Sequence, residues 1–177
     1  MKKLLAIIGV SVVFLLIYLL QINFFNWFTI AGIKPNLFVI YVVVISLFTG
    51  KKIGTIFGIC IGLYIDMLNG RVLGIASIML VGISFFAKFM NKNFTNDTKI
   101  TMVLIVALST FFYEFGYYII SIWKLSINIE MFQFIKILFV ETIFNSLLTI
   151  ILYPHIQKLG VYLSEIFNKR SFLRTYF

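Results

Sequence analysis

Hydrophobic residues fill long stretches of this chain, and short polar or basic segments separate the stretches. A helix needs about 20 consecutive apolar residues to cross the hydrocarbon core of a bilayer. The pattern therefore predicts an all-α polytopic membrane protein with six transmembrane helices. The predicted spans are residues 4–25, 35–49, 53–68, 73–90, 100–123 and 131–153. Residues 154–177 follow as a basic amphipathic tail that is expected to lie at the cytoplasmic face of the membrane.

The division between the second and third spans rests on a pair of lysines. Gly50-Lys51-Lys52 interrupts an apolar stretch that otherwise runs from Pro35 to Leu68. A single fused span would place both lysines near the bilayer centre, at a cost of roughly 2.5–3.5 kcal/mol each. Two short helices joined by a tight turn avoid this cost. Pro35 also suits the first turn of a helix, where its missing N–H would have no partner anyway.

The basic residues fall unevenly on the two sides of the predicted bundle. With the amino terminus in the cytoplasm, eleven of the 15 Lys and Arg residues lie on the inner side and four on the outer side. Basic residues are enriched in cytoplasmic loops of membrane proteins. The distribution therefore supports six crossings with both termini in the cytoplasm.

Composition and charge narrow the possible functions. The chain of 177 residues is 62% hydrophobic and 12% charged, so no segment is left to form a sizeable water-soluble domain. The net charge of +9 follows from the basic ends of the apolar stretches rather than from a nucleic-acid-binding patch. No hydrolase, metalloprotease or phosphate-binding motif is present, and Cys60 and His155 are each single. We therefore expect neither an enzyme nor a bound cofactor or metal.

Glycines recur every four residues from the turn before the third span into that span, at Gly50, Gly54, Gly58 and Gly62. Each step of four residues advances the position about 40° around a helix, so the glycines form a shallow spiral stripe. Small residues let the backbones of membrane helices approach closely. The stripe therefore predicts a helix-packing surface, and it suggests that the third span is the central helix of the bundle.

The same spacing continues to an aspartate at the outer end of this span. Asp66 is followed by Gly70 and Gly74, where the chain has to turn and re-enter the membrane. A carboxylate there can accept hydrogen bonds from N–H groups of the turn or of the next helix. We expect Asp66, Gly70, Arg71 and Gly74 to form a structural hairpin in which Arg71 is the counter-ion.

Two further carboxyl groups lie inside predicted spans at a similar depth, Glu114 in the fifth and Glu141 in the sixth. Tyr118 and Asn145 lie one helical turn further along, so each carboxyl group begins a polar stripe. Ionisable residues in membrane helices face the bundle interior or a wet cavity. The four residues therefore predict either an intramembrane polar pocket or a set of interhelical hydrogen bonds. The second interpretation is favoured because no further basic group lies at that depth.

Lys34-Pro35-Asn36-Leu37, the four-spaced glycines and the segment GLYIDMLNGRVLGIAS at residues 62–77 resemble the MreD family of bacterial rod shape-determining proteins. The resemblance covers nearly the whole chain. It implies a non-enzymatic scaffold subunit of the cell-elongation complex in the bacterial inner membrane, with no catalytic residues. The implied partners are the single-span protein MreC, the transglycosylase RodA, a penicillin-binding protein and the MreB filament.

A second function remains open, because members of this family also resemble the substrate-binding subunits of energy-coupling-factor transporters. Under that alternative, the polar residues around Glu114 and Glu141 would bind a solute. Membrane lipids are expected partners in either case, since each basic residue near an anionic membrane surface contributes about 1 kcal/mol of binding.

Overall fold

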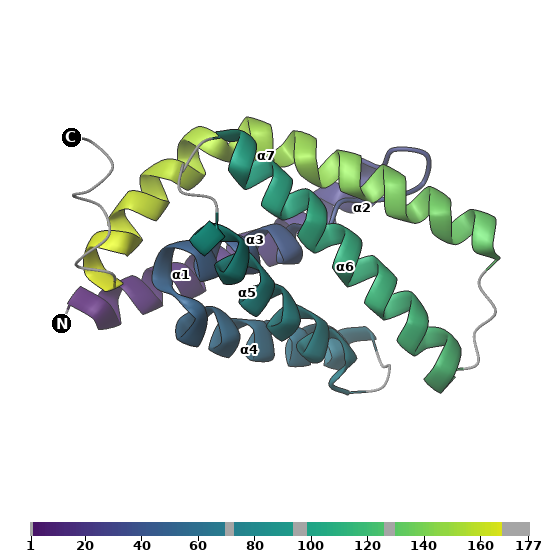
Figure 1. Ribbon diagram of the computed structural model, residues 1–177, viewed down its shortest axis with the longest axis horizontal. Coiled ribbons are helices and arrows are strands. Elements are labelled where there is room, and N and C mark those ends of the chain that lie inside the picture. The colour runs from purple at the N-terminus through teal and green to yellow at the C-terminus, as the bar shows by residue number, and fades with distance from the viewer. Residues whose placement is uncertain (1, 70–72, 94–98, 126–129, 168–177) are drawn as a thin grey trace.

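The computed structural model describes residues 2–69, 73–93, 99–125 and 130–167 (Figure 1). The described chain is all-helical, apart from an isolated bridge between Ile30 and Ile33. Its elements are, in order, α1 (Lys2–Leu19), the π-helical turn η1 (Leu20–Phe24), α2 (Phe25–Trp27), α3 (Leu37–Thr49), α4 (Lys51–Asn69), α5 (Ile75–Asn93), α6 (Lys99–Leu125) and α7 (Met131–Phe167). The first predicted span corresponds to the continuous helical segment α1–η1–α2, and each other predicted span to one helix.

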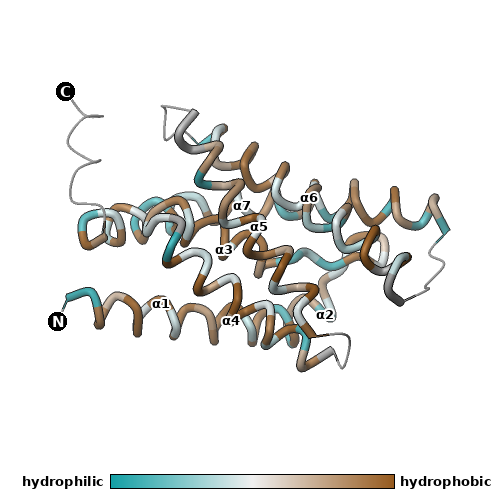
Figure 2. Tube along the Cα trace, turned by 60° about the horizontal axis from the view of Figure 1, so that its bottom comes forward, coloured by the Kyte–Doolittle hydropathy of each residue, from teal (hydrophilic) through white to brown (hydrophobic). Residues whose placement is uncertain are grey.

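Within the described residues, three helical segments are long and apolar enough to cross a membrane: Lys2–Trp27, Lys99–Ile120 and Met131–Phe167. Two shorter apolar helical segments, Leu37–Thr49 and Ile75–Met90, accompany them. Figure 2 shows hydrophobic residues along most of α1, beginning after a hydrophilic start at the amino terminus. Side chains of α1 are exposed on most of its circumference, which suits contact with lipid. These features are those of a membrane protein.

The last helix extends beyond Tyr153, where the sequence analysis ends the sixth span. Pro154 lies inside α7, and the helix bends in this region in Figure 1. Proline removes a main-chain donor and displaces the preceding turn, so it bends a helix without ending it. The segment after the bend packs against the bundle: Gly160 faces the ring of Phe48, and Leu163 is 1% exposed. The described start of the predicted tail is therefore part of the helical core.

The central helix is α3, and not the glycine-rich helix that the sequence analysis favours. Nearly every side chain of α3 is buried, and the helix contacts α1, α4, α5, α6 and α7. Its sequence LFVIYVVVISLFT is apolar around the whole circumference, which is typical of a helix surrounded by protein. In contrast, α4 buries its glycine face and exposes the opposite face, which includes Ile56 and Met67.

Gly58 and Gly62 of α4 form a seam with the neighbouring helix α5, and Gly54 faces both Ser46 of α3 and Ser84 of α5. Gly54, Gly58 and Gly62 are all buried. A Cβ atom at Gly58 would lie 3.2 Å from the main-chain carbonyl group of Leu80, and one at Gly62 would overlap main-chain atoms of Ser77. The two helices can therefore lie this close only because these positions lack side chains.

A hydrogen bond also crosses this seam, whereas the first glycine of the repeat, Gly50, takes no part in it. The Ser77 hydroxyl group donates to the main-chain carbonyl oxygen of Ile59 at 3.2 Å. Gly50, which the sequence analysis includes in the stripe, lies outside the seam in the turn between α3 and α4. Its φ of +93° is in a region that residues with a Cβ rarely adopt. The repeat of four thus combines a turn glycine with three packing glycines.

Candidate functional site

Polar side chains from three other helical elements meet at the start of α3. Asn36 caps this helix, and its side-chain oxygen accepts from the N–H of Val39 at 3.4 Å. Asparagine is a favoured capping residue because its side chain replaces the missing intrahelical acceptor. Pro35, directly before the cap, is buried. The first peptide groups of α3 therefore need hydrogen-bond partners from elsewhere in the protein.

Gln21 supplies two of these partners from the π-helical turn η1. Its Nε2 donates to the carbonyl oxygen of Pro35 at 2.7 Å, and its Oε1 accepts from the N–H of Leu37 at 3.0 Å. The side chain is 7% exposed, in a helical segment whose other faces are largely exposed. Sequence reasoning did not identify Gln21. The available signal was a long polar side chain within an otherwise apolar span.

Asn145 of α7 holds the start of α3 from the opposite side. Its Oδ1 accepts from the main-chain N–H of Asn36 at 2.9 Å, and its Nδ2 donates to the hydroxyl group of Thr110 at 2.9 Å. Asn145 is fully buried. This single amide therefore connects α3, α6 and α7. An unpaired amide group in such a place would carry a large desolvation cost.

The two predicted intramembrane carboxyl groups lie together beside this amide. The carboxyl groups of Glu114 and Glu141 interact directly, and the side chain of Asn36 reaches Glu141 as well. Glu141 is 7% exposed, and its Oε1 atom has no hydrogen-bond partner in the described part of the chain. The sequence analysis places the two glutamates at the same depth in the membrane, and in the structure they lie close to each other.

Tyr118, the fourth residue of the predicted polar pocket, has different neighbours. Its ring stacks on Phe134 with the ring centres 3.9 Å apart and an interplanar angle of 14°. This contact joins α6 to the first turn of α7. Tyr118 therefore contributes to helix packing at the end of this pair.

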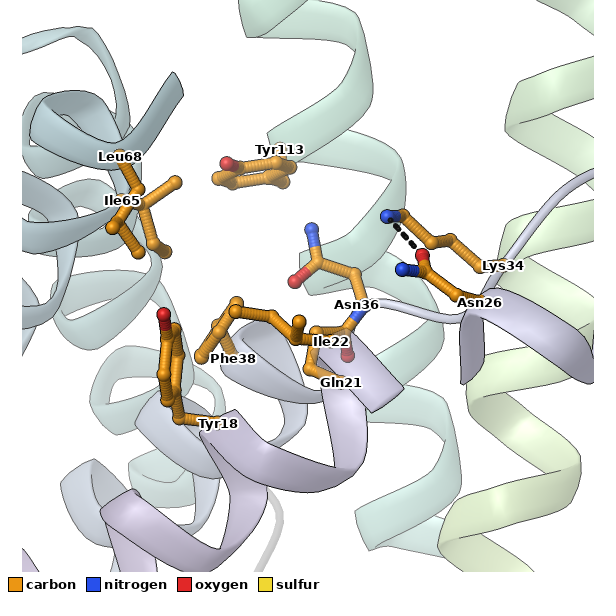
Figure 3. A pocket seen from close by; sticks show the side chains of 10 residues that line it. All are labelled: Tyr18, Gln21, Ile22, Asn26, Lys34, Asn36, Phe38, Ile65, Leu68 and Tyr113. Carbon is orange, nitrogen blue, oxygen red and sulfur yellow. Dashed lines mark hydrogen bonds between the residues drawn. The ribbon is translucent and has the colours of Figure 1, made fainter. Parts of the chain in front are cut away.

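A cavity of about 420 Å³ lies beside the start of α3 (Figure 3). Ten residues line it: Tyr18, Gln21, Ile22, Asn26, Lys34, Asn36, Phe38, Ile65, Leu68 and Tyr113. None of the four predicted pocket residues is among them. Two residues of the lining connect the cavity to the glutamates: Tyr113 interacts electrostatically with both carboxyl groups, and Asn36 interacts with Glu141.

Asp66 lies at the α4–α5 hairpin and holds the beginning of α5. Its Oδ2 accepts from the N–H of Gly74 at 2.8 Å, and its Oδ1 accepts from the N–H of Ala76 at 3.2 Å. These N–H groups have no intrahelical acceptor, and the positive end of the helix dipole favours a carboxylate there. Gly74 has a φ of +102°. Gly70 and Arg71, the other two predicted hairpin residues, lie outside the described residues.

No cluster of three or more metal-binding side chains occurs in the residues that the structure describes.

A family model described as "rod shape-determining protein MreD" matches residues 1–162 of the chain. The matched region includes the start of α3, the glycine seam and the polar residues of α6 and α7. No curated protein and no solved structure matches the chain.

Proposed function

The chain belongs to the MreD family of rod shape-determining proteins, and on this premise we propose that it is a scaffold subunit of the bacterial cell-elongation complex. The family match over residues 1–162 is the observation that carries this proposal, and it implies a role in determining rod shape. The family is one of structural membrane proteins and is not known as an enzyme. The proposed direct partner is MreC, which the scaffold positions for peptidoglycan synthesis together with RodA, a penicillin-binding protein and MreB.

The helical architecture supports a scaffold that binds through the membrane. The described loops are short, so a partner has to contact helix surfaces, loop ends or the cytoplasmic basic residues. Without a hydrophobic drive between helices in lipid, such contacts depend on close packing and interhelical hydrogen bonds. A single-span partner can meet both requirements along one exposed helix of this bundle.

The proposed topology has six crossings in the inner membrane, with both termini in the cytoplasm. The 13 residues of α3 are about 20 Å long, which is shorter than the hydrocarbon core. Pro35 and Asn36, which precede α3 without regular secondary structure, extend this crossing in the proposed topology. Non-helical backbone at membrane depth is tolerated when it is buried in protein and its polar groups are paired. The hydrogen bonds from Gln21 and Asn145 satisfy that requirement.

Depletion of the protein from a rod-shaped host is expected to change cell shape. Cells should become wider and then round, because the elongation complex loses a subunit, and a plasmid copy of the chain should restore the rod. The measurement is the ratio of cell length to width by phase-contrast microscopy. Cells that keep their rod shape but require an added vitamin or other nutrient would contradict the proposal.

The cavity favours one alternative function, that of a solute-binding subunit of an energy-coupling-factor-type transporter. Its volume of about 420 Å³ lies in the range of small-molecule sites. Under this alternative the purified protein would carry an ATPase module, and depletion would produce the nutrient requirement. Changing both Glu114 and Glu141 to Gln would then abolish solute binding while assembly persists.

A further inference from the structure

The cavity beside the start of α3 has one polar wall and one apolar wall. The polar wall comes from the end of the first helical segment and from the approach to α3: Gln21, Asn26, Lys34 and Asn36. The apolar wall comes from η1, α3 and α4: Ile22, Phe38, Ile65 and Leu68. Figure 3 shows Ile65 and Leu68 on the opposite side of the space from Lys34 and Asn26, whereas Ile22 and Phe38 lie beside Gln21 and Asn36. A ligand that uses both walls has to be amphiphilic.

Lys34 is the single charged residue among the ten that line the cavity. Its ammonium group points into the space in Figure 3 and donates to Asn26 Oδ1 at 3.3 Å. An ammonium group has three donors, so this bond to a neutral amide leaves donors for a ligand. The Nδ2 group of Asn26 supplies two more hydrogen-bond donors. Glu141 interacts with Lys34 electrostatically but forms no part of the lining. The polar wall thus offers a cation and neutral donors.

The apolar wall continues to the exposed surface of the protein. Ile65 is partly buried, whereas Leu68 is 52% exposed, so the cavity opens along this side of α4. Trp27, one position beyond the lining residue Asn26, is 93% exposed. Tryptophan is enriched at the boundary between the hydrocarbon core and the headgroups. We therefore expect the Asn26 side of the cavity to lie at the depth where lipid headgroups meet their acyl chains.

We propose that this cavity binds one anionic phospholipid, with the headgroup phosphate against Lys34 and Asn26 and an acyl chain along Ile65 and Leu68. Phosphate oxygens accept charge-assisted hydrogen bonds from lysine. An uncharged sugar headgroup would leave the Lys34 ammonium group without an anionic partner inside the cavity. Free phosphate would leave the apolar wall unused. A lipid satisfies both walls and reaches the opening directly from the bilayer.

The experiment uses the full chain, purified in detergent and depleted of lipid, with dioleoyl phosphatidylglycerol added. Native mass spectrometry counts bound lipid, and thermal unfolding gives the stabilisation. We expect one tightly bound phosphatidylglycerol, weaker binding of phosphatidylcholine, and no competition from inorganic phosphate. Lys34→Gln should weaken binding about tenfold or more. Leu68→Trp, which fills the cavity and keeps the lysine, should do the same.

Lys136→Gln is the matched control, because it removes an exposed lysine of α7 that does not line the cavity. It should bind phosphatidylglycerol as the unaltered chain does. Equal binding of phosphatidylcholine, competition by inorganic phosphate, or equal losses in the Lys34 and Lys136 variants would overturn the proposal. If the Lys34 variant does not fold, the Leu68 variant decides: unchanged lipid binding in that protein would overturn the proposal, and lost binding would support it.

Discussion

Gly62→Ala is expected to lower the free energy of unfolding by about 1–3 kcal/mol or more, which is the usual range for inserting a methyl group into a close-packed interior. The new Cβ atom would overlap main-chain atoms of Ser77, and main-chain atoms cannot move aside as a flexible side chain can. The α4 and α5 helices would have to separate along the seam. Reversible unfolding in mixed detergent and SDS micelles measures the change.

Gly82→Ala is the matched control for this prediction. Gly82 also lies in a helix, α5, but a Cβ atom there would meet nothing within 4 Å. Alanine has the higher helix propensity by about 0.5–1 kcal/mol, so this variant should unfold no more easily than the unaltered chain. Similar losses of stability in the two variants would show that the α4–α5 seam is not closely packed.

Asp66→Asn is expected to destabilise the protein by about 1–3 kcal/mol, the cost of leaving a buried donor without its acceptor. The carboxylate uses both oxygens to accept from the N–H groups of Gly74 and Ala76. An asparagine keeps one oxygen and turns an NH2 group toward the other N–H. The charge that favours the start of α5 is also lost. Thermal unfolding of the detergent-purified protein measures the change.

Glu165→Gln is the control for removal of a carboxylate. Glu165 lies on an exposed face of α7, so its replacement should leave the unfolding temperature unchanged. An Asp66 variant as stable as the Glu165 variant would mean that the two hydrogen bonds at the hairpin contribute nothing to stability.

The sequence predicted the ends of helices well where the length of an apolar stretch and the positions of lysines determine them, as at the turn between α3 and α4. It misplaced the centre of the bundle. A stripe of glycines shows that one face of a helix meets a neighbour closely, but it says nothing of the other faces. The circumference of α3, which is apolar on all sides, was the better signal of full burial. The same holds for Gly50, because a spacing of four residues alone does not distinguish a glycine in a turn from one in a helix.

The polar site was predictable in part. Depth along two helices was enough to bring Glu114, Glu141 and Asn145 into one neighbourhood. The partners of Asn145 were not predictable, because one of them is the main-chain N–H of Asn36, far away in the sequence. The role of Gln21 depends on a π-helical turn and on the irregular segment before α3. No regular spacing of hydrophobic residues marks either the π-helical turn or the irregular segment, so the hydrophobic pattern does not reveal them.

Affinity purification of the tagged chain from native membranes tests the scaffold role most directly. We expect MreC, a single-span protein, in an amount close to that of the tagged chain, with both proteins identified and quantified by mass spectrometry. Recovery of an ATPase module in place of MreC would contradict the account.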